Sequence, residues 1–305
     1  MSEPLAYLSG QFLPFSRAAV PVTDAGFVQG VTVAEQLRTF GGKLFRLEKH
    51  LSRLSRSLEI IGLELGMPLA RLGEIAEELA TKNHALLASS DDLGLSMFVT
   101  PGAYSTFAAA ETSQGPTVGV HTYPLPFQLW QEKYERGESL VVTDVMQVPA
   151  ACWPTELKCR SRMHYYLADK QARAIQPGAR ALMLDEQGFV TEASTANILV
   201  YYRDTGLVSP PKEKILPGVS MAVLEELAGE TGVPFSHREL TVDDVAAADE
   251  ALLCSTSPCV WPVTRLNGRV IGSGGRGEVC RLILEAWSKL VGLDIVEQAR
   301  RHSQR

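Results

Sequence analysis

Apolar side chains recur at steps of three and four between residues 44 and 62, and this is the clearest pattern in the chain. Because that spacing places apolar residues on one face of an α-helix, it predicts a helix that packs against a core. Gly62 is placed to end this helix. The stripe consists of Leu47, Leu51, Leu54, Leu58 and Ile61. Further helices are predicted at about 69–89, 161–175, 219–230 and 277–291.

Apolar runs of β type predict strands around these helices. Residues 5–13 and 19–27 read as short strands broken by turns, and 93–100 and 116–123 read as longer strands. Residues 179–211 contain several such runs separated by Glu-Gln-Gly and Asp-Thr-Gly turns, which predicts a meander. Two local signals add to this picture. Asn267-Gly268 predicts a hairpin, and Thr241 with Asp244 resembles a capping box before a short helix.

The order of these elements predicts an α+β fold in both halves of the chain. The alternating strand and helix order of a Rossmann domain is not seen. A stretch rich in proline and charge, TYPLPFQLWQEKYERGE (122–138), has no clean periodicity and marks the domain boundary. We therefore expect a small α+β domain over 1–122, a linker over 123–138 and a larger domain over 139–305.

Composition narrows the range of partners. The chain has 305 residues and a net charge of −6, which argues against binding to nucleic acid or an anionic membrane. Its five cysteines are odd in number, lack CxxC spacing and have no histidines clustered beside them. This argues against a disulfide framework or a zinc site, so we expect no metal. Without a signal-peptide pattern or a membrane-length apolar run, the expected location is the cytoplasm.

Several residues could carry chemistry, although each also has an ordinary structural explanation. In ILPGVS (215–220), Val219 and Ser220 could offer helix N-terminal N–H groups to a phosphate, or the segment could be a simple turn. STSP (255–258) follows an apolar strand and could either grip an anion or only end that strand. Arg53 lies one step off the apolar stripe and could belong to a solvated basic face.

Two further residues are ambiguous from position alone. Glu192 follows a hairpin turn among β residues, where a carboxylate on an outward strand face is common. Lys158 precedes a predicted helix, and most lysines are surface residues.

Taken together, these segments resemble one family in order and spacing. The chain resembles the class IV (fold type IV) pyridoxal-phosphate enzymes: branched-chain aminotransferases, D-amino-acid aminotransferases and aminodeoxychorismate lyase. The resemblance runs from about residue 8 to 290. It rests on SGQFLPFSRAAVPVTDAGFVQGVTVAEQLRTFGGKLFRLEKHLSRLSRSLEI, LKCRSRMHYYLADKQA, ALMLDEQGFVTEASTANILV, KILPGVSMAVLEELAGETGV, ADEALLCSTSPCVWPV and NGRVIGSGGRG.

The resemblance implies a role for each candidate residue. Lys158 would hold pyridoxal 5′-phosphate as an aldimine and move the substrate's Cα proton. Glu192 would keep the pyridine nitrogen protonated, so that the ring can accept electrons. The remaining cofactor-binding residues, among them those of the phosphate site, would be Arg53, Asn197, Leu216, Val219, Ser220 and Thr256.

The substrate side departs from the family pattern. Gly94, Thr106 and Ala108 stand where related enzymes place an arginine for the substrate carboxylate. That carboxylate could instead meet the backbone at Thr256 and Ser257, or Arg38. Arg38 could equally pair with a neighbouring acid. Phe27 is expected to line the substrate pocket.

We therefore expect a ping-pong aminotransferase acting on an amino acid and a 2-oxo acid. The resemblance implies a small N-terminal domain, a larger domain with a β-barrel-like core, a cofactor between them, and a homodimer. Lys158-x-x-Ser161-Arg162 keeps a lyase acting on aminodeoxychorismate as the alternative. A binding protein without activity on the same scaffold is a third hypothesis, which the joint presence of Lys158, Glu192 and Arg53 disfavours.

Overall fold

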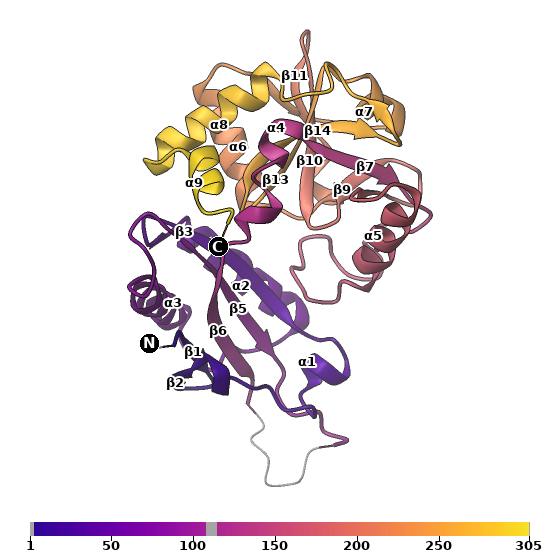
Figure 1. Cartoon of the computed structure of the whole chain (residues 1–305). Helices are drawn as coiled ribbons and strands as arrows, with labels where there is room; N and C mark the ends of the chain where they lie inside the picture. The colour runs from indigo at the N-terminus through magenta and orange to yellow at the C-terminus, as the bar shows by residue number, and fades with distance from the viewer. Residues whose placement is uncertain (1–2, 108–114, 305) are drawn as a thin grey trace. The chain divides into compact units, whose positions relative to one another are not determined.

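The computed structural model describes residues 3–107 and 115–304 and divides the chain into two compact units (Figure 1). The first unit consists of Met1–Leu125 with Leu157–Ser161, and the second of Pro126–Glu156 with Arg162–Arg305. The first unit thus extends slightly past residue 122, where we expected its end. Most of the expected linker belongs to the second unit, where the Tyr134 hydroxyl donates to the carbonyl of Pro258 at 2.8 Å.

The first unit is a six-stranded sheet with two long helices on one face. Its sheet has the order β2-β1-β6-β5-β3-β4. The elements are β1 (Leu5–Leu8), β2 (Gln11–Pro14), η1 (Phe15–Arg17), α1 (Ala25–Val28), β3 (Val33–Phe40), β4 (Lys43–Leu44), α2 (Leu47–Ile61), α3 (Leu69–His84), β5 (Leu93–Thr100) and β6 (Thr117–Pro124).

The core of the first unit lies between its sheet and helices α2 and α3 (Figure 1). Leu54 of α2, Leu79 of α3 and Leu95 of β5 are completely buried there. Helix α2 ends at Gly62, whose φ of 64° is left-handed backbone that glycine adopts without strain. The periodicity prediction for this helix is therefore confirmed, and the prediction of a second helix from residue 69 is confirmed with an earlier end.

One sequence prediction in this unit is wrong. Residues 19–27 do not form a strand: 19–24 are irregular, and α1 begins at Ala25. The reason is Asp24, whose Oδ1 accepts from the backbone N–H of Gly26 at 2.7 Å and so caps the helix. Its Oδ2 accepts from the hydroxyls of Thr100 and Thr117 at 2.9 and 2.6 Å, which ties the segment to β5 and β6.

The second unit contains a closed sheet. Its elements are η2 (Phe127–Leu129), α4 (Lys133–Arg136), β7 (Glu138–Val142), α5 (Met163–Ile175), β8 (Arg180–Leu184), β9 (Val190–Ala193), β10 (Ala196–Tyr202), β11 (Gly206–Ser209), η3 (Lys212–Lys214), α6 (Val219–Glu230), β12 (Phe235–His237), α7 (Val242–Ala247), β13 (Glu250–Ser255), β14 (Cys259–Leu266), β15 (Arg269–Val270), α8 (Glu278–Val291) and α9 (Ile295–Arg301).

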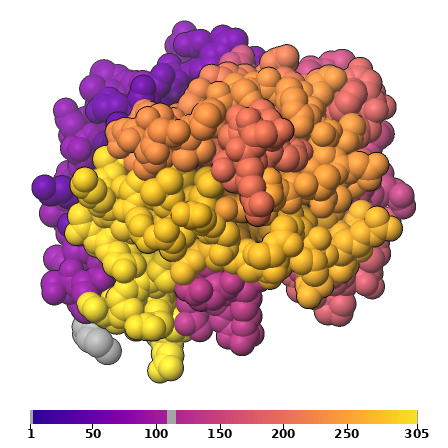
Figure 2. Space-filling model, turned by 90° about the horizontal axis from the view of Figure 1, so that it is seen from above, coloured from indigo at the N-terminus to yellow at the C-terminus, as the bar shows by residue number. Residues whose placement is uncertain are grey.

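Strand β9 closes the sheet, because it pairs with β8 on one side and β10 on the other. The ring runs β10-β13-β14-β7-β8-β9 and returns to β10, which confirms the expected barrel-like core. Helices α6 and α8 pack against strands of this ring, and the C-terminal residues lie on the surface (yellow in Figure 2).

Local predictions for this unit are confirmed. The Asn267-Gly268 hairpin joins β14 to β15, and both turn residues have positive φ. The Thr241 capping box starts α7. Helix α9 was not predicted, although Asp294 caps it by accepting from the Glu297 N–H at 2.9 Å.

Candidate functional site

The segment that carries Lys158 is held by the backbone of the first unit. It runs antiparallel to β3, with a bridge that joins Val33 to Cys159. Lys158 accepts through its carbonyl from the Ala34 N–H at 3.0 Å, and Arg160 donates its N–H to the carbonyl of Thr32 at 2.8 Å. A loop that pairs like a strand holds its side chains in fixed directions, so Lys158 is not a loosely placed surface lysine.

Helix α2 adds a further hydrogen bond to this segment. The N–H of Lys158 donates to the Ser57 hydroxyl at 3.2 Å, and Ser57 is completely buried. On α2, Ser57 lies one turn after Arg53, and His50 lies one turn before it. The structure therefore brings Arg53 and Lys158 into the same part of the first unit.

Arg53 belongs to a buried charged cluster. Its Nε and Nη2 donate to the two carboxylate oxygens of Glu35, each at 2.7 Å. His50 Nδ1 lies 2.7 Å from Oε2 of the same carboxylate. The side chains of Glu35 and His50 are 0% and 1% exposed, and that of Arg53 is 8% exposed. The solvated basic face that we considered for Arg53 is therefore wrong.

Contacts within the cluster and its burial shift the pKa values of Glu35 and His50. Burial alone raises the pKa of Glu35, but the charge of Arg53 and hydrogen bonds from Arg53 and His50 outweigh it and lower the pKa to about 2. Burial lowers the pKa of His50, against the opposing effect of Glu35. At neutral pH the cluster is thus a Glu35–Arg53 ion pair beside a neutral imidazole, with the guanidinium fixed in place by a bidentate contact.

Sequence analysis missed Glu35. A signal was available, because Glu35 alternates with Val33 and Leu37 and so faces the core side of β3 with them. An acid on that face needs a buried cation, and the stripe of α2 places Arg53 and His50 opposite it.

In the second unit, Glu192 and Asn197 hold one loop together. They are directly opposed on β9 and β10, so their side chains share a face. Glu192 Oε1 accepts from the N–H of Leu216 at 2.6 Å, and the Asn197 amide donates to the carbonyl of Leu216 at 3.1 Å. Glu192 is 3% exposed, so it does not lie on an outward strand face as its ordinary explanation supposed.

The loop at Leu216 leads into the N-terminus of α6. Gly218 is the N-cap, and α6 begins with Val219 and Ser220, which are both buried. A Cβ on Gly218 would stand 2.1 Å from the Asn197 side-chain oxygen, so only glycine allows this close approach. The first N–H groups of α6, which have no partner within the helix, therefore follow the loop that Glu192 and Asn197 hold, and such groups can bind a phosphate or a carboxylate.

Thr256 and Ser257 lie in the turn between β13 and β14. Strand β13 is the neighbour of β10, and Cys254 is directly opposed to Asn197. Burial, and to a smaller extent the charge of Glu192, raises the pKa of the Cys254 thiol, so this cysteine is neutral. The expected cofactor residues of the second unit thus gather at one end of neighbouring strands.

The expected substrate residues of the first unit differ in exposure: Phe27 is exposed, and Arg38 is buried. Phe27 is 74% exposed on α1 and lines a cavity. Arg38 is 1% exposed in β3, where its Nε donates to the Thr39 carbonyl at 3.2 Å and its guanidinium lies 4.0 Å from the centre of the Phe40 ring. Gly94 lies in β5 against the ring of Tyr123, and Ala108 is outside the described residues.

None of the described helices is both long and apolar enough to cross a membrane. Over residues 3–107 and 115–304, no three or more His, Cys, Asp and Glu side chains are grouped to hold a metal ion.

Comparisons with known proteins give a consistent family. The family model described as amino-transferase class IV matches residues 32–266. A D-alanine aminotransferase of Bacillus licheniformis is 29% identical over 281 residues, which cover 91% of this chain and 94% of the relative. A putative branched-chain-amino-acid aminotransferase of Methanocaldococcus jannaschii is 26% identical over 284 residues, covering 93% of this chain and 95% of the relative.

Solved structures show the same fold. The branched-chain amino acid aminotransferase of Escherichia coli superposes with a TM-score of 0.86 at 22% identity, covering 95% of both chains. A second branched-chain amino acid aminotransferase, from T.th. and solved with pyridoxamine 5′-phosphate, has a TM-score of 0.85 at 24% identity, again over 95% of both chains. The α+β, fold type IV architecture expected from the sequence is therefore confirmed.

Proposed function

The chain belongs to the class IV aminotransferases, so it is an enzyme of amino transfer that works with pyridoxal phosphate, and we propose that Lys158 holds this cofactor and carries the proton. The observation that supports this role most directly is the fixed backbone of Lys158, paired with β3 and bonded to Ser57. Its substrates are an amino acid and a 2-oxo acid.

The residues present fit the cofactor. A phosphate dianion needs several N–H donors and a cation, and we propose the first N–H groups of α6 as the donors and Arg53 as the cation. The close approach of Gly218 to Asn197 keeps the loop before α6 in place. A protonated pyridine nitrogen needs a buried carboxylate, and Glu192 is one. Arg53, Asn197, Leu216, Val219, Ser220 and Thr256 complete the proposed binding set.

The protein's residues divide the work of the reaction among them. When bound, pyridoxal phosphate supplies a ring that withdraws electrons from the substrate Cα. Lys158 accepts the Cα proton at Nζ and then donates it again, which is general acid–base catalysis by a lysine held in place. Glu192 would hold the pyridine nitrogen of the bound cofactor through its carboxylate and favour the protonated form of that nitrogen. Phe27, Arg38 and Ser257 remain our candidates for contacts with the substrate.

Amino transfer is tested by incubating the holoenzyme with amino acids and 2-oxo acids and measuring the new amino acid. The lyase alternative rests on Ser161 and Arg162, and the relatives described above, all aminotransferases, favour transfer over elimination. Formation of a new amino acid without 4-aminobenzoate from aminodeoxychorismate supports our proposal. The opposite pattern would replace it by the lyase.

Replacing Glu192 by Gln should slow the reaction with an amino acid by roughly 100-fold or more, because a charge at the electron-accepting group is lost. The glutamine oxygen can still accept from the Leu216 N–H, so the loop and the bound cofactor should remain. Stopped-flow spectroscopy of the half-reaction measures the change. Glu186→Gln, in the exposed turn before β9, is the control, and a rate for Glu192→Gln within threefold of that control would refute the role.

We also propose a homodimer in the cytoplasm. The resemblance implies a dimer, and the first unit exposes large apolar side chains that a partner can cover, including Val22 at 75% and Phe27 at 74%. The five cysteines are free thiols, as in a reducing compartment. Light scattering should give twice the mass of one chain. A monomer at micromolar concentration would contradict the assembly but not the chemistry.

A further inference from the structure

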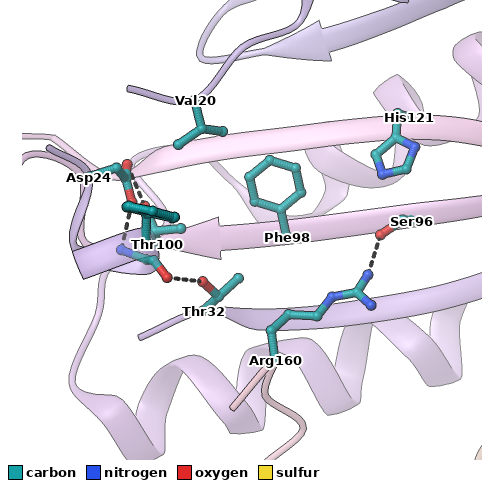
Figure 3. Close-up of a pocket in the computed structure, with 10 residues that line it drawn as sticks. Val20, Asp24, Thr32, Ser96, Phe98, Thr100, His121 and Arg160 are labelled. Carbon is teal, nitrogen blue, oxygen red and sulfur yellow. Dashed lines mark hydrogen bonds between the residues drawn. The ribbon is translucent and has the colours of Figure 1, made fainter. Parts of the chain in front are cut away.

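A cavity of about 320 Å³ lies on the face of the first unit's sheet that is turned away from α2 and α3. At one end Asp24 and Thr100 line it, and at the other end Arg160, Ser96 and His121 (Figure 3). Phe98 lies between the two ends. The cavity is formed by the first unit alone, and its polar groups are divided by sign between its ends.

The two ends differ in charge. Both oxygens of Asp24 accept hydrogen bonds, from the N–H of Gly26 and from the hydroxyls of Thr100 and Thr117. The negative charge of this end therefore belongs to a carboxylate that is already bonded to neighbouring residues. At the other end, burial, aided by the charge of Arg160, lowers the pKa of His121 despite a hydrogen bond with the Thr122 carbonyl. The positive charge of that end therefore comes from Arg160.

Arg160 and Lys158 share a face. The bridge between Val33 and Cys159 sets Lys158 opposite Ala34 and Arg160 opposite Thr32, and opposed residues in an antiparallel pair point to the same side. Residues two apart along such a segment are separated by about 7 Å. Arg160 therefore starts from the same side of the paired segment as Lys158, the residue that we assign to proton transfer, and only two positions after it.

The direction of the Arg160 side chain is fixed. It extends across β3, and its Nη2 donates to the Ser96 hydroxyl at 2.8 Å (Figure 3). Ser96 is 1% exposed, so its hydroxyl is a buried anchor on β5. On this face β3 presents Ala34, which is opposed to Phe98, and Gln36, which is opposed to Ser96.

We propose that Arg160 is the specificity-determining residue that binds a carboxylate of the substrate, with Ser96 as its positioning residue. This inference rests on the proposed function and adds to it a residue for the substrate carboxylate. A planar guanidinium fits a carboxylate with two parallel hydrogen bonds. The carboxylate is the α-carboxylate of any amino acid or the side-chain carboxylate of a dicarboxylic one, and the two make different predictions.

The test compares Arg160→Gln with wild-type holoenzyme on alanine and glutamate, in both enantiomers, and on ethylamine, which is alanine without its carboxylate. We expect KM for the amino acids and Kd for propionate to rise about 10- to 100-fold, the effect of losing a charge-assisted hydrogen bond. The kcat/KM for ethylamine should change at least tenfold less. A rise for alanine assigns the α-carboxylate, and a rise for glutamate alone assigns the side-chain carboxylate.

Three further variants separate binding from folding. Arg160→Lys should recover part of the affinity, because it restores the charge without the planar fork. Ser96→Ala should give a smaller rise in KM. Arg71→Gln, on the exposed face of α3, is the control for loss of an arginine. An amino acid KM for Arg160→Gln within twofold of wild type, or an equal loss with ethylamine, overturns the inference alone. A wild type that converts no donor overturns the proposed function as well.

Discussion

Replacement of Lys158 by alanine should lower the rate of amino transfer by about 1,000-fold or more. The change removes both the amine that binds the cofactor and the group that moves the Cα proton, and general acid–base catalysis by itself contributes about 100- to 10,000-fold. The hydrogen bonds that hold the segment involve the backbone of residue 158, so the fold should be kept. Steady-state formation of the new amino acid measures the loss.

Lys49→Ala is the matched control for this variant, because Lys49 is an exposed lysine on α2 in the same unit. The control should keep the wild-type rate and the same circular dichroism as Lys158→Ala. A Lys158→Ala protein with a rate within tenfold of wild type would refute the assignment. Recovery of activity by an added small amine would support it, since the amine replaces the missing base.

Replacement of Glu35 by glutamine should lower the free energy of unfolding by about 3–5 kcal/mol at pH 7. The reason is that Arg53 keeps its charge in a buried site and loses the carboxylate that neutralises it. Affinity for pyridoxal phosphate should fall too, because the bidentate contact no longer fixes the guanidinium. Urea unfolding and cofactor titration measure the two effects. Glu59→Gln, which breaks an exposed pair with Arg56, should cost at most about 1 kcal/mol.

The same variant tests the ionisation of Glu35. The pKa of this carboxyl is lowered from 4.5 to about 2 in the folded protein, so the unfolded chain binds a proton more readily. The stabilisation is therefore fully present above pH 4.5 and is lost as the pH falls towards 2. The difference in unfolding free energy between wild type and Glu35→Gln should shrink over this window. A constant difference would mean that Glu35 does not carry the charge.

Helix positions were the most predictable part of the fold, because the sequence contains the local signals that define them. The stripe of α2, the cap Gly62 and the Thr241 capping box each act within a few residues. The prediction for residues 19–27 was wrong because contacts with distant residues decide the structure there. The apolar residues of this segment suggested a strand, but Asp24 caps a helix and binds two threonines from distant strands, which no local pattern reveals.

The candidate site was predictable only in part. Lys158, Glu192 and Arg53 became candidates only through a resemblance, since a lysine, a glutamate and an arginine taken singly have ordinary surface explanations. Glu35 was missed because its partners Arg53 and His50 come from a different element, and only tertiary packing brings a strand carboxylate to a helix guanidinium. Arg160 was not considered as a substrate-binding residue, because the direction of its side chain depends on the pairing of its segment with β3.

The absorption spectrum of the purified protein with pyridoxal phosphate tests the central claim most directly. We expect a near-ultraviolet or visible band that disappears when a suitable L- or D-amino acid is added and returns with a 2-oxo acid. The same band should be missing from Lys158→Ala. A protein that shows no band after incubation with the cofactor, or a band that no amino acid changes, would contradict the assignment of this chain as an aminotransferase that acts through Lys158.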